Sequence, residues 1–309
     1  MTEVISMANK RIILSALLCF SVFYVGCSEK KETHSVTSGY ITVKGSEQTL
    51  PMMTEEAYSF MELYDKAKIL VIDGGSNYGL AAIFMDSAQI AVSTRPMNAD
   101  ELNRAKTAGF NVNEFKIAKD GIAIIVNPVN PINKLTVEQV NKIFSGEIKT
   151  WSTVKGPNWP IQVHIWDEAS GTYVFFKDSI LLGKNYAQSA KRFSSTEAMI
   201  RSLYEEKGAI GLVSMSRLYR TWSPLIEESR IKALAIAQDN KSESIPPDEA
   251  AVHADLYPFV RYIYLYTAWE PKDLDAGFIT YITSSPGQKI IAANGFVPIT
   301  VPVTYKDSL

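Results

Sequence analysis

The chain has 309 residues, of which 46% are hydrophobic and 21% are charged, and its formal net charge is −2. This composition is ordinary for a globular protein, and the length suffices for two lobes with sizeable hydrophobic cores. The near-neutral charge excludes the broad basic field on which nucleic-acid binding depends. An anionic ligand would therefore be captured by a few local groups, and no nucleic-acid partner is expected.

The first 27 residues have the pattern of a targeting segment. A basic pair precedes an apolar run from Ile12 to Val25, which is shorter than the roughly 20 residues of a membrane span. The run leads into Cys27 and resembles a bacterial lipobox, although Tyr24 stands where that pattern prefers leucine. We expect a signal peptide over residues 1–27, an extracytoplasmic location and a lipid anchor on Cys27. An ordinary signal peptide or an uncleaved anchor is the alternative.

The sequence after Cys27 contains no cysteine, since the only other one is Cys19. The mature domain therefore has no disulfide, no cysteine-based metal site and no thiol nucleophile. No metal or cofactor is expected. Residues 28–39 are rich in Ser, Thr, Lys and Glu and lack apolar periodicity, which predicts a flexible tether between the membrane and the domain.

From residue 40 onward, segments with strand-like and helix-like patterns alternate. Short apolar runs such as Ile69 to Ile72 are typical of buried parallel strands. The alternating order predicts an α/β protein with a parallel sheet. The expected strands cover residues 40–43, 69–72, 89–92, 121–127, 161–166, 210–213 and 261–266, and the expected helices cover 54–65, 79–85, 98–108, 136–144, 194–204 and 275–293.

Several helix ends carry capping signals. Capping boxes begin at Asn98, Thr136 and Ser194, each followed three residues later by Glu or Gln. Asn294-Gly295 is suited to a left-handed cap at the end of the last helix. The prolines that follow Asn127 are typical of an interlobe boundary.

Three small, hydroxyl-rich turns lie between a strand and a helix, at residues 45–51, 74–79 and 169–172. Helix starts attract anions because their first N–H groups are unpaired and the helix dipole is positive there. A fourth element, Ser93 to Pro96, brings Arg95, whose guanidinium suits an oxyanion. Each feature alone is typical of an ordinary cap or a surface ion pair. Their combination in this order indicates an anion site.

These motifs together resemble the phosphate-binding components of bacterial phosphate ABC importers, which have the type II periplasmic binding fold. The resemblance covers residues 40–298, and Ser170-Gly171-Thr172 is its most distinctive motif. The further matching motifs are Ile143–Trp151, Gly208–Gly211, Tyr257-Pro258 with Arg261, Gly287-Gln288 and Gly295–Pro298.

The resemblance implies two α/β lobes with a ligand cleft between them. Lobe 1 is expected to comprise residues 40–123 and 262–309, and lobe 2 residues 124–261. The implied function is a monomeric binding protein that captures phosphate or a similar oxyanion, closes around it and delivers it to the permease subunits of an ABC importer. Binding without catalysis is implied. The residues implied to bind the ligand are Thr49 through its hydroxyl, Leu50 through its amide, Ser76, Thr94, Arg95, Ser170, Gly171 and Thr172.

Two departures from the family pattern bear on the ligand. Thr94 stands where some phosphate binders carry a buried Asp that accepts the proton of hydrogen phosphate. Threonine carries no negative charge, so it should repel sulfate less, and we expect weak selectivity for phosphate over sulfate. Trp166 stands where the family often has Arg, so either Arg95 supplies the missing positive charge or the pocket holds a different ligand.

Two other classes of function remain open. The histidines His34, His164 and His253 leave a hydrolase possible, although the sequence contains neither Gly-x-Ser-x-Gly nor a metal-binding histidine spacing. The same fold could also serve sensing or surface binding without transport.

Overall fold

The structure is a computed structural model that describes residues 35–218 and 231–299. Cys27, His34 and most of the predicted tether therefore lie outside the described residues. Within the described ranges, no helix is both long enough and apolar enough to span a membrane.

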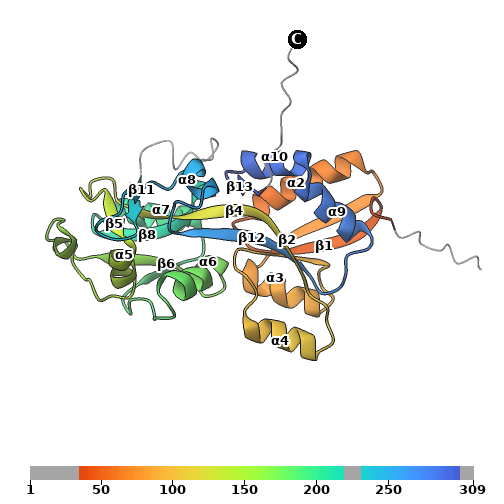
Figure 1. Cartoon of the computed structure of the whole chain (residues 1–309), viewed down its shortest axis with the longest axis horizontal. Coiled ribbons are helices and arrows are strands. Elements are labelled where there is room, and N and C mark those ends of the chain that lie inside the picture. The colour runs from red at the N-terminus through yellow and green to blue at the C-terminus, as the bar shows by residue number, and fades with distance from the viewer. Residues whose placement is uncertain (1–34, 219–230, 300–309) are drawn as a thin grey trace, which may run out of the picture. The chain divides into compact units, whose positions relative to one another are not determined.

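One twisted sheet runs through the described part of the chain, in the order β2-β1-β3-β12-β4-β8-β6-β7 (Figure 1). The first three of these strands pair in parallel, and so do β8, β6 and β7. Two short strands, β9 and β13, also pair with β4. The bounds are β1 Gly39–Gly45, β2 Ala67–Asp73, β3 Ile90–Ser93, β4 Asn113–Val126, β6 Gln162–Trp166, β7 Lys191–Phe193, β8 Ala209–Ser214, β9 Lys232–Ala233, β12 Val260–Thr267 and β13 Val297–Pro298.

We use lobe 1 for the elements around β1, β2 and β3. Helices α2, α9 and α10 cover one face of this part of the sheet, and α3 and α4 lie on the other (Figure 1). Phe60, Phe278 and Ile291 are buried in the first layer, whereas Leu80 and Tyr266 are buried in the second. The bounds are α2 Leu50–Leu63, α3 Gly75–Phe84, α4 Ala99–Thr107, α9 Leu274–Thr283 and α10 Ser285–Ala293.

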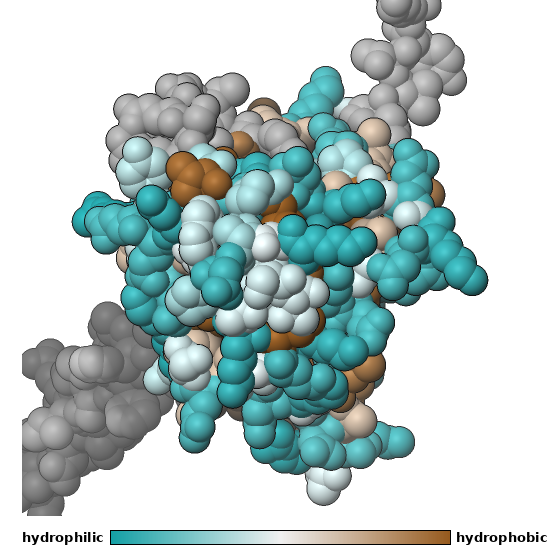
Figure 2. Space-filling view, turned by 90° about the vertical axis from the view of Figure 1, so that its left-hand side faces the viewer, coloured by the Kyte–Doolittle hydropathy of each residue, from teal (hydrophilic) through white to brown (hydrophobic). Residues whose placement is uncertain are grey.

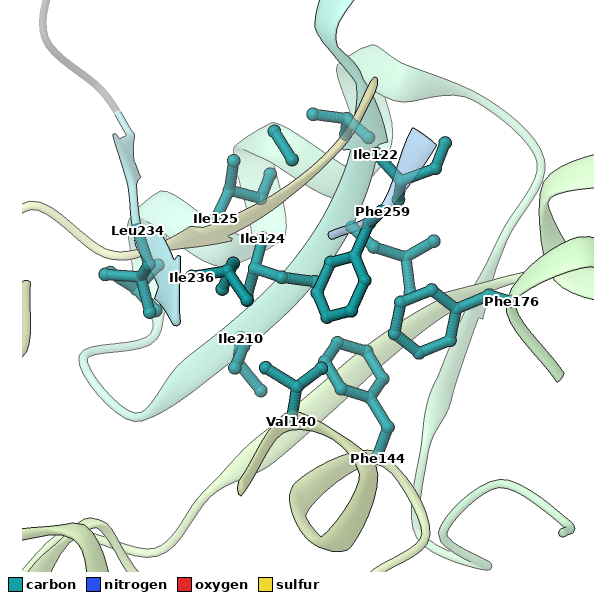
Figure 3. Packing of buried hydrophobic residues seen from close by; sticks show 14 of the residues in the cluster. Ile122, Ile124, Ile125, Val140, Phe144, Phe176, Ile210, Leu234, Ile236 and Phe259 are labelled. Atoms are coloured by element: carbon teal, nitrogen blue, oxygen red, sulfur yellow. The ribbon is translucent and has the colours of Figure 1, made fainter. Parts of the chain in front are cut away.

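We use lobe 2 for the elements around β6 and β8, which have a separate hydrophobic core (Figure 3). Phe144, Phe176 and Phe259 meet in this core, with ring centroids 4.9 and 6.0 Å from that of Phe176. The outer face of the lobe is mainly hydrophilic (Figure 2). The bounds are α5 Val137–Phe144, α6 Gly171–Phe175, α7 Thr196–Glu205 and α8 Glu249–His253, with a small sheet of β5 Lys134–Thr136, β10 Ala235–Ala237 and β11 Ser244–Ile245.

Two long antiparallel strands, β4 and β12, pass between the two cores. Residues 113–121 of β4 pair with β12, and residues 122–126 pair with β8. Ile117 accordingly lies in the core of lobe 1, and Ile124 lies in that of lobe 2. The predicted lobe boundaries, after residues 123 and 261, fall on these strands and stay a prediction.

The predicted α/β class is confirmed, but the sheet is mixed rather than parallel, because β12 runs antiparallel to β3 and β4, and β4 runs antiparallel to β8. The local signals are confirmed in part. Asn98 and Thr136 form capping boxes as predicted. The third box is wrong by one residue, because Ser195 rather than Ser194 caps α7. The expected single C-terminal helix is also wrong: the chain is extended at Ser284, and α10 begins anew at Ser285 with a proline in its first turn, where proline is tolerated.

Candidate functional site

The turns that follow β2 and β3 in lobe 1 meet the turn that follows β6 in lobe 2. Ser76 and Thr94 are fully buried, with their hydroxyl oxygens 3.2 Å apart, and the Thr94 N–H donates to Ser76 Oγ at 3.1 Å. A Cβ placed on Gly171 would lie 2.3 Å from both of these oxygens. Only glycine permits so close an approach of the lobe 2 backbone, so the facing turns are in contact.

The Ser170-Gly171-Thr172 motif is shaped by local capping. Ser170 caps α6 by accepting a hydrogen bond from the Thr172 N–H at 3.2 Å. Asp167 Oδ1 accepts the N–H groups of Ala169 and Ser170, which turns the chain from β6 into the helix. This geometry presents the Ser170 and Thr172 hydroxyls to lobe 1.

Glu168 and Trp166, which lie shortly before this motif in the sequence, both have structural roles. Glu168 pairs with Arg192 at the surface, with an N–O distance of 2.6 Å. Trp166 is buried and donates from its indole nitrogen to the Leu212 carbonyl at 2.9 Å. It therefore packs in lobe 2 and supplies no charge.

The sequence offered Arg95 as one source of positive charge for the cleft, and the structure places its guanidinium among acceptors of lobe 1. Its guanidinium forms an ion pair with Glu101 at 2.7 Å and also donates to Asn77 Oδ1 and the Pro96 carbonyl. All five N–H bonds of the guanidinium are thus directed at acceptors within lobe 1. Burial raises the pKa of Glu101, but the hydrogen bonds from Arg95 and the Asn98 N–H, together with the positive charges of Arg95 and Arg104, hold this pKa below its ordinary value. These internal contacts argue against a ligand contact by Arg95, which stays a prediction.

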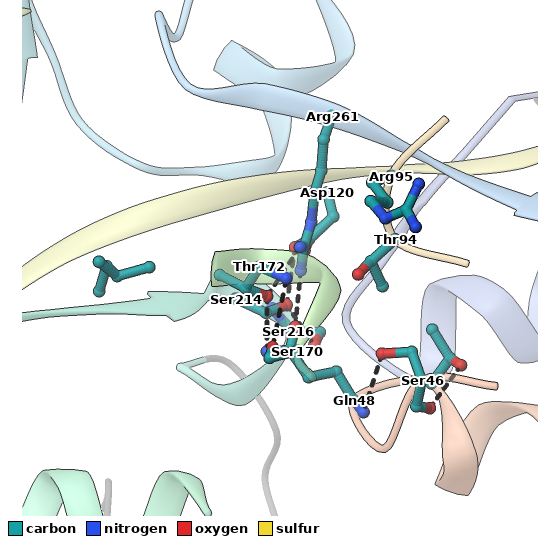
Figure 4. A network of polar contacts seen from close by, with 12 residues as sticks. Ser46, Gln48, Thr94, Arg95, Asp120, Ser170, Thr172, Ser214, Ser216 and Arg261 are labelled. Atoms are coloured by element: carbon teal, nitrogen blue, oxygen red, sulfur yellow. Dashed lines mark hydrogen bonds and ion pairs between the residues drawn. The ribbon is translucent and has the colours of Figure 1, made fainter. Parts of the chain in front are cut away.

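Arg261 on β12 is the cation that reaches the motif, and sequence reasoning missed its role. It is 2% exposed and donates to Thr172 Oγ1 at 2.8 Å. Its Nε and Nη2 atoms also donate to Asp120 Oδ2, at 3.0 and 2.8 Å (Figure 4). Asp120 Oδ1 in turn accepts from the Ser214 hydroxyl at 2.8 Å. A signal was present, because Arg261 and Asp120 each interrupt a mainly apolar strand segment.

The turn after β1 contributes Gln48 rather than the residues that the resemblance implied. Gln48 is buried, donates from Nε2 to Thr172 Oγ1 at 2.8 Å and accepts from Arg261 Nη2 at 2.6 Å (Figure 4). Thr49 instead donates its hydroxyl to the Ser46 carbonyl, and the Leu50 N–H points at the Glu47 carbonyl. Ligand contacts by Thr49 and Leu50 stay predictions.

Glu47 places an acidic group beside the site. Its Oε1 atom is buried without a hydrogen-bond partner among the described residues. Burial raises the pKa of this carboxyl above its ordinary value, and the neighbouring Asp73 raises it further, whereas Arg261 and Arg217 lower it. Glu47, Asp73 and Ser170 line a cavity of about 200 Å³. Within the described residues, no cluster of metal-ligating side chains occurs.

The family model described as PBP superfamily domain matches residues 30–286. Among curated proteins, the phosphate-binding protein PstS of Pseudomonas aeruginosa is 26% identical over 289 residues, covering 88% of this chain and 87% of the relative. The PstS of Bacillus subtilis is 27% identical and covers 97% of both chains.

The solved structures that resemble this one share its fold. A substrate-binding protein of Clostridium perfringens, assigned to phosphate ABC transport and solved with bound phosphate, superposes with a TM-score of 0.70 at 22% identity, covering 85% of this chain and all of that one. An ABC-type phosphate transport receptor of Vibrio cholerae gives a TM-score of 0.69 at 23% identity, with 84% and 100% coverage. The predicted type II fold is therefore confirmed, and the chain belongs to the PBP superfamily.

Proposed function

We propose that the protein is an extracytoplasmic substrate-binding protein that captures inorganic phosphate, or a similar oxyanion, for an ABC importer. The observation that carries the proposal is the meeting of buried hydroxyls from three turns of the two lobes, of which that of Thr172 accepts a hydrogen bond from the buried guanidinium of Arg261. The names of the relatives and the phosphate bound in the Clostridium perfringens structure support phosphate as the ligand.

Capture in this site would rely mainly on neutral donors. The positive charge of Arg261 is balanced by Asp120, so the pair brings directed N–H bonds but little net charge. The hydroxyls of Ser76, Thr94, Ser170 and Thr172, together with the first N–H groups of α3, would replace the water around the anion. Because these donors come from both lobes, bound anion would favour the arrangement in which the lobes touch.

Several finer features belong to the same proposal. The lipid anchor on Cys27, the monomeric state, delivery to permease subunits and the lobe boundaries after residues 123 and 261 are proposed from the sequence. Mass spectrometry of the cell-derived protein tests the anchor, because lipidation adds acyl mass to a peptide that begins at Cys27. An unmodified Cys27 within an intact N-terminal segment would contradict it.

We also propose that the protein binds without catalysing a reaction. His164, one candidate base, is fully buried against the ring of Phe193, and neither ring nitrogen has a hydrogen-bond partner among the described residues. Burial lowers the pKa of this imidazole to about 4. A histidine held in this way is not paired with a serine nucleophile, and the relatives are named as binding proteins.

Calorimetric titration of the protein with phosphate and then with sulfate tests the function. We expect one-to-one phosphate binding that Ser170→Ala weakens about tenfold, the effect of losing one good hydrogen bond to a charged group. Ser179→Ala is the matched control, because Ser179 is exposed on lobe 2 away from the motif. The sequence-based prediction of weak selectivity requires sulfate to bind within about tenfold of phosphate. No heat from folded, ligand-free protein would refute phosphate as the ligand.

A further inference from the structure

The carboxamide of Gln48 contacts two groups that the proposed function assigns to the anion. Its Oε1 accepts from Arg261 Nη2 at 2.6 Å, and its Nε2 donates to Thr172 Oγ1 at 2.8 Å. Arg261 Nη1 closes the triangle by donating to the same Thr172 oxygen at 2.8 Å. An amide fits here because it offers an acceptor to the guanidinium and a donor to the hydroxyl oxygen at once.

The triangle uses most of the hydrogen-bonding capacity of its members. Thr172 Oγ1 accepts twice, which fills both of its lone pairs. Both N–H bonds of Arg261 Nη2 are directed at Gln48 and Asp120, and Nε is directed at Asp120. An anion that binds Arg261 through Nη2 must therefore replace the Gln48 carbonyl oxygen, because both Nη2 hydrogens are already engaged.

The same contacts join the two lobes. Gln48 follows β1 in lobe 1, whereas Thr172 belongs to α6 in lobe 2. All three members of the triangle are at most 3% exposed, so water competes little for their hydrogen bonds. Two other cross-lobe hydrogen bonds are longer: Asn77 Nδ2 donates to the Glu168 carbonyl at 3.3 Å, and Arg217 Nη2 donates to the Glu47 carbonyl at 3.5 Å. On β4, Lys119 also pairs with Asp255 at 2.6 Å, but the Asp255 side chain is 62% exposed.

We propose that Gln48 is an affinity-limiting latch: its side chain holds the lobes together without ligand and competes with the anion for Arg261 Nη2. The claim that Gln48 competes with the anion rests on the proposed function. The claim that it holds the lobes together does not. Removing the carboxamide should loosen the ligand-free protein and also tighten phosphate binding, because the incoming anion no longer displaces an internal partner.

The test compares Gln48→Ala with Gln238→Ala, whose glutamine is exposed on the surface, in the full chain. Hydrogen exchange of the ligand-free protein is followed by mass spectrometry in peptides that cover residues 45–50 and 169–174. We expect faster exchange in both peptides for Gln48→Ala and no change for Gln238→Ala. Unchanged exchange in Gln48→Ala would overturn the latch.

Phosphate titration of the same variants tests the competition. We expect Gln48→Ala to bind phosphate about three- to tenfold more tightly, the scale of one or two displaced hydrogen bonds. Equal or weaker binding would overturn the competition, and weaker binding would make Gln48 a ligand contact. If neither the parent nor the variant binds phosphate, the proposed function fails, and the exchange result alone still decides the latch.

Gln48→Glu is a second variant that keeps the size of the side chain. Its carboxylate can accept from Arg261 but cannot donate to Thr172, and it adds a negative charge beside the anion donors. We expect phosphate binding to weaken more than tenfold, with the ligand-free exchange close to that of the parent. Undiminished phosphate affinity in this variant would contradict the placement of Gln48 at the anion donors.

Discussion

Arg261 and Asp120 form a buried ion pair between two directly paired residues of β12 and β4, the strands that pass between the lobes. Nη2 and Oδ2 are 2.8 Å apart, and the two side chains are 1% and 0% exposed. Because β12 and β4 belong to the sheet shared by both cores, the pair fixes a guanidinium at the junction beside Thr172. The site is thereby tied to the part of the fold about which the lobes would move.

Breaking this pair should cost both stability and binding. Arg261→Met leaves Asp120 as an uncompensated buried charge, and we expect the free energy of unfolding to fall by about 3–5 kcal/mol in urea denaturation. Arg261→Met combined with Asp120→Leu should regain most of that stability and still fail to bind phosphate. Phosphate binding by the folded double variant would show that Arg261 is dispensable for capture.

Arg95 should behave differently, because its guanidinium is fully engaged within lobe 1. We expect Arg95→Gln to change the phosphate dissociation constant less than threefold in calorimetry. The same variant should lose about 1–3 kcal/mol of unfolding free energy, since Glu101 loses its buried partner. A loss of phosphate affinity of a hundredfold or more would restore Arg95 as a ligand contact.

Gly171 should be indispensable for closure but not for folding. In Gly171→Ala the new methyl group would collide with Ser76 and Thr94, whose oxygens lie 2.3 Å from its position. Because this contact is between lobes rather than inside a core, we expect a melting temperature close to that of the parent and loss of phosphate binding. If this variant bound phosphate as tightly as the parent, contact between the two turns would not be required for phosphate binding.

Glu56 on α2 should make stability depend on pH. It is fully buried, and neither carboxyl oxygen has a hydrogen-bond partner among the described residues. Burial, with a smaller contribution from Glu55, raises its pKa to about 9. The folded state then holds a proton that the unfolded chain releases near pH 4.5, so stability falls as pH rises from that value towards 9.

Replacing Glu56 with Gln removes the contribution of this proton to the pH dependence of stability. We expect Glu56→Gln to raise the unfolding free energy at neutral pH by about 3 kcal/mol, with no gain below pH 4, where both side chains are neutral. Glu62→Gln is the control, because Glu62 is exposed on the same helix. Equal stability of the parent and Glu56→Gln at pH 8 would refute a neutral Glu56.

Sequence patterns predicted the elements well where local chemistry dominates. The capping boxes at Asn98 and Thr136 formed because side chain and backbone satisfy each other within one turn. The start of α2 was predicted four residues late, at residue 54, whereas the helix begins at Leu50 and Pro51 already lies in its first turn. Such errors arise where two signals for the start of a helix lie close together in the sequence.

The site was harder to predict because it depends on pairings between distant residues. The hydroxyls of Ser76 and Thr94 do meet Gly171, as the order of the motifs suggested. The role of Arg261 depends on its register against Asp120, 141 positions away, and that of Gln48 on a partner 124 positions away. Arg95 was chosen for its type and place, but its partner Glu101 lies only six residues along the chain. The spacing of residues in the sequence could not show which arginine already has its hydrogen-bond partners nearby in the chain.

A crystal structure of the protein grown with phosphate tests the central claim most directly. We predict a tetrahedral anion within hydrogen-bonding distance of Ser76, Ser170 and Arg261, with the Gln48 carboxamide turned away from Arg261. Phosphate bound at Arg95 instead, or an anion elsewhere with the Gln48–Arg261–Thr172 contacts intact, would contradict it.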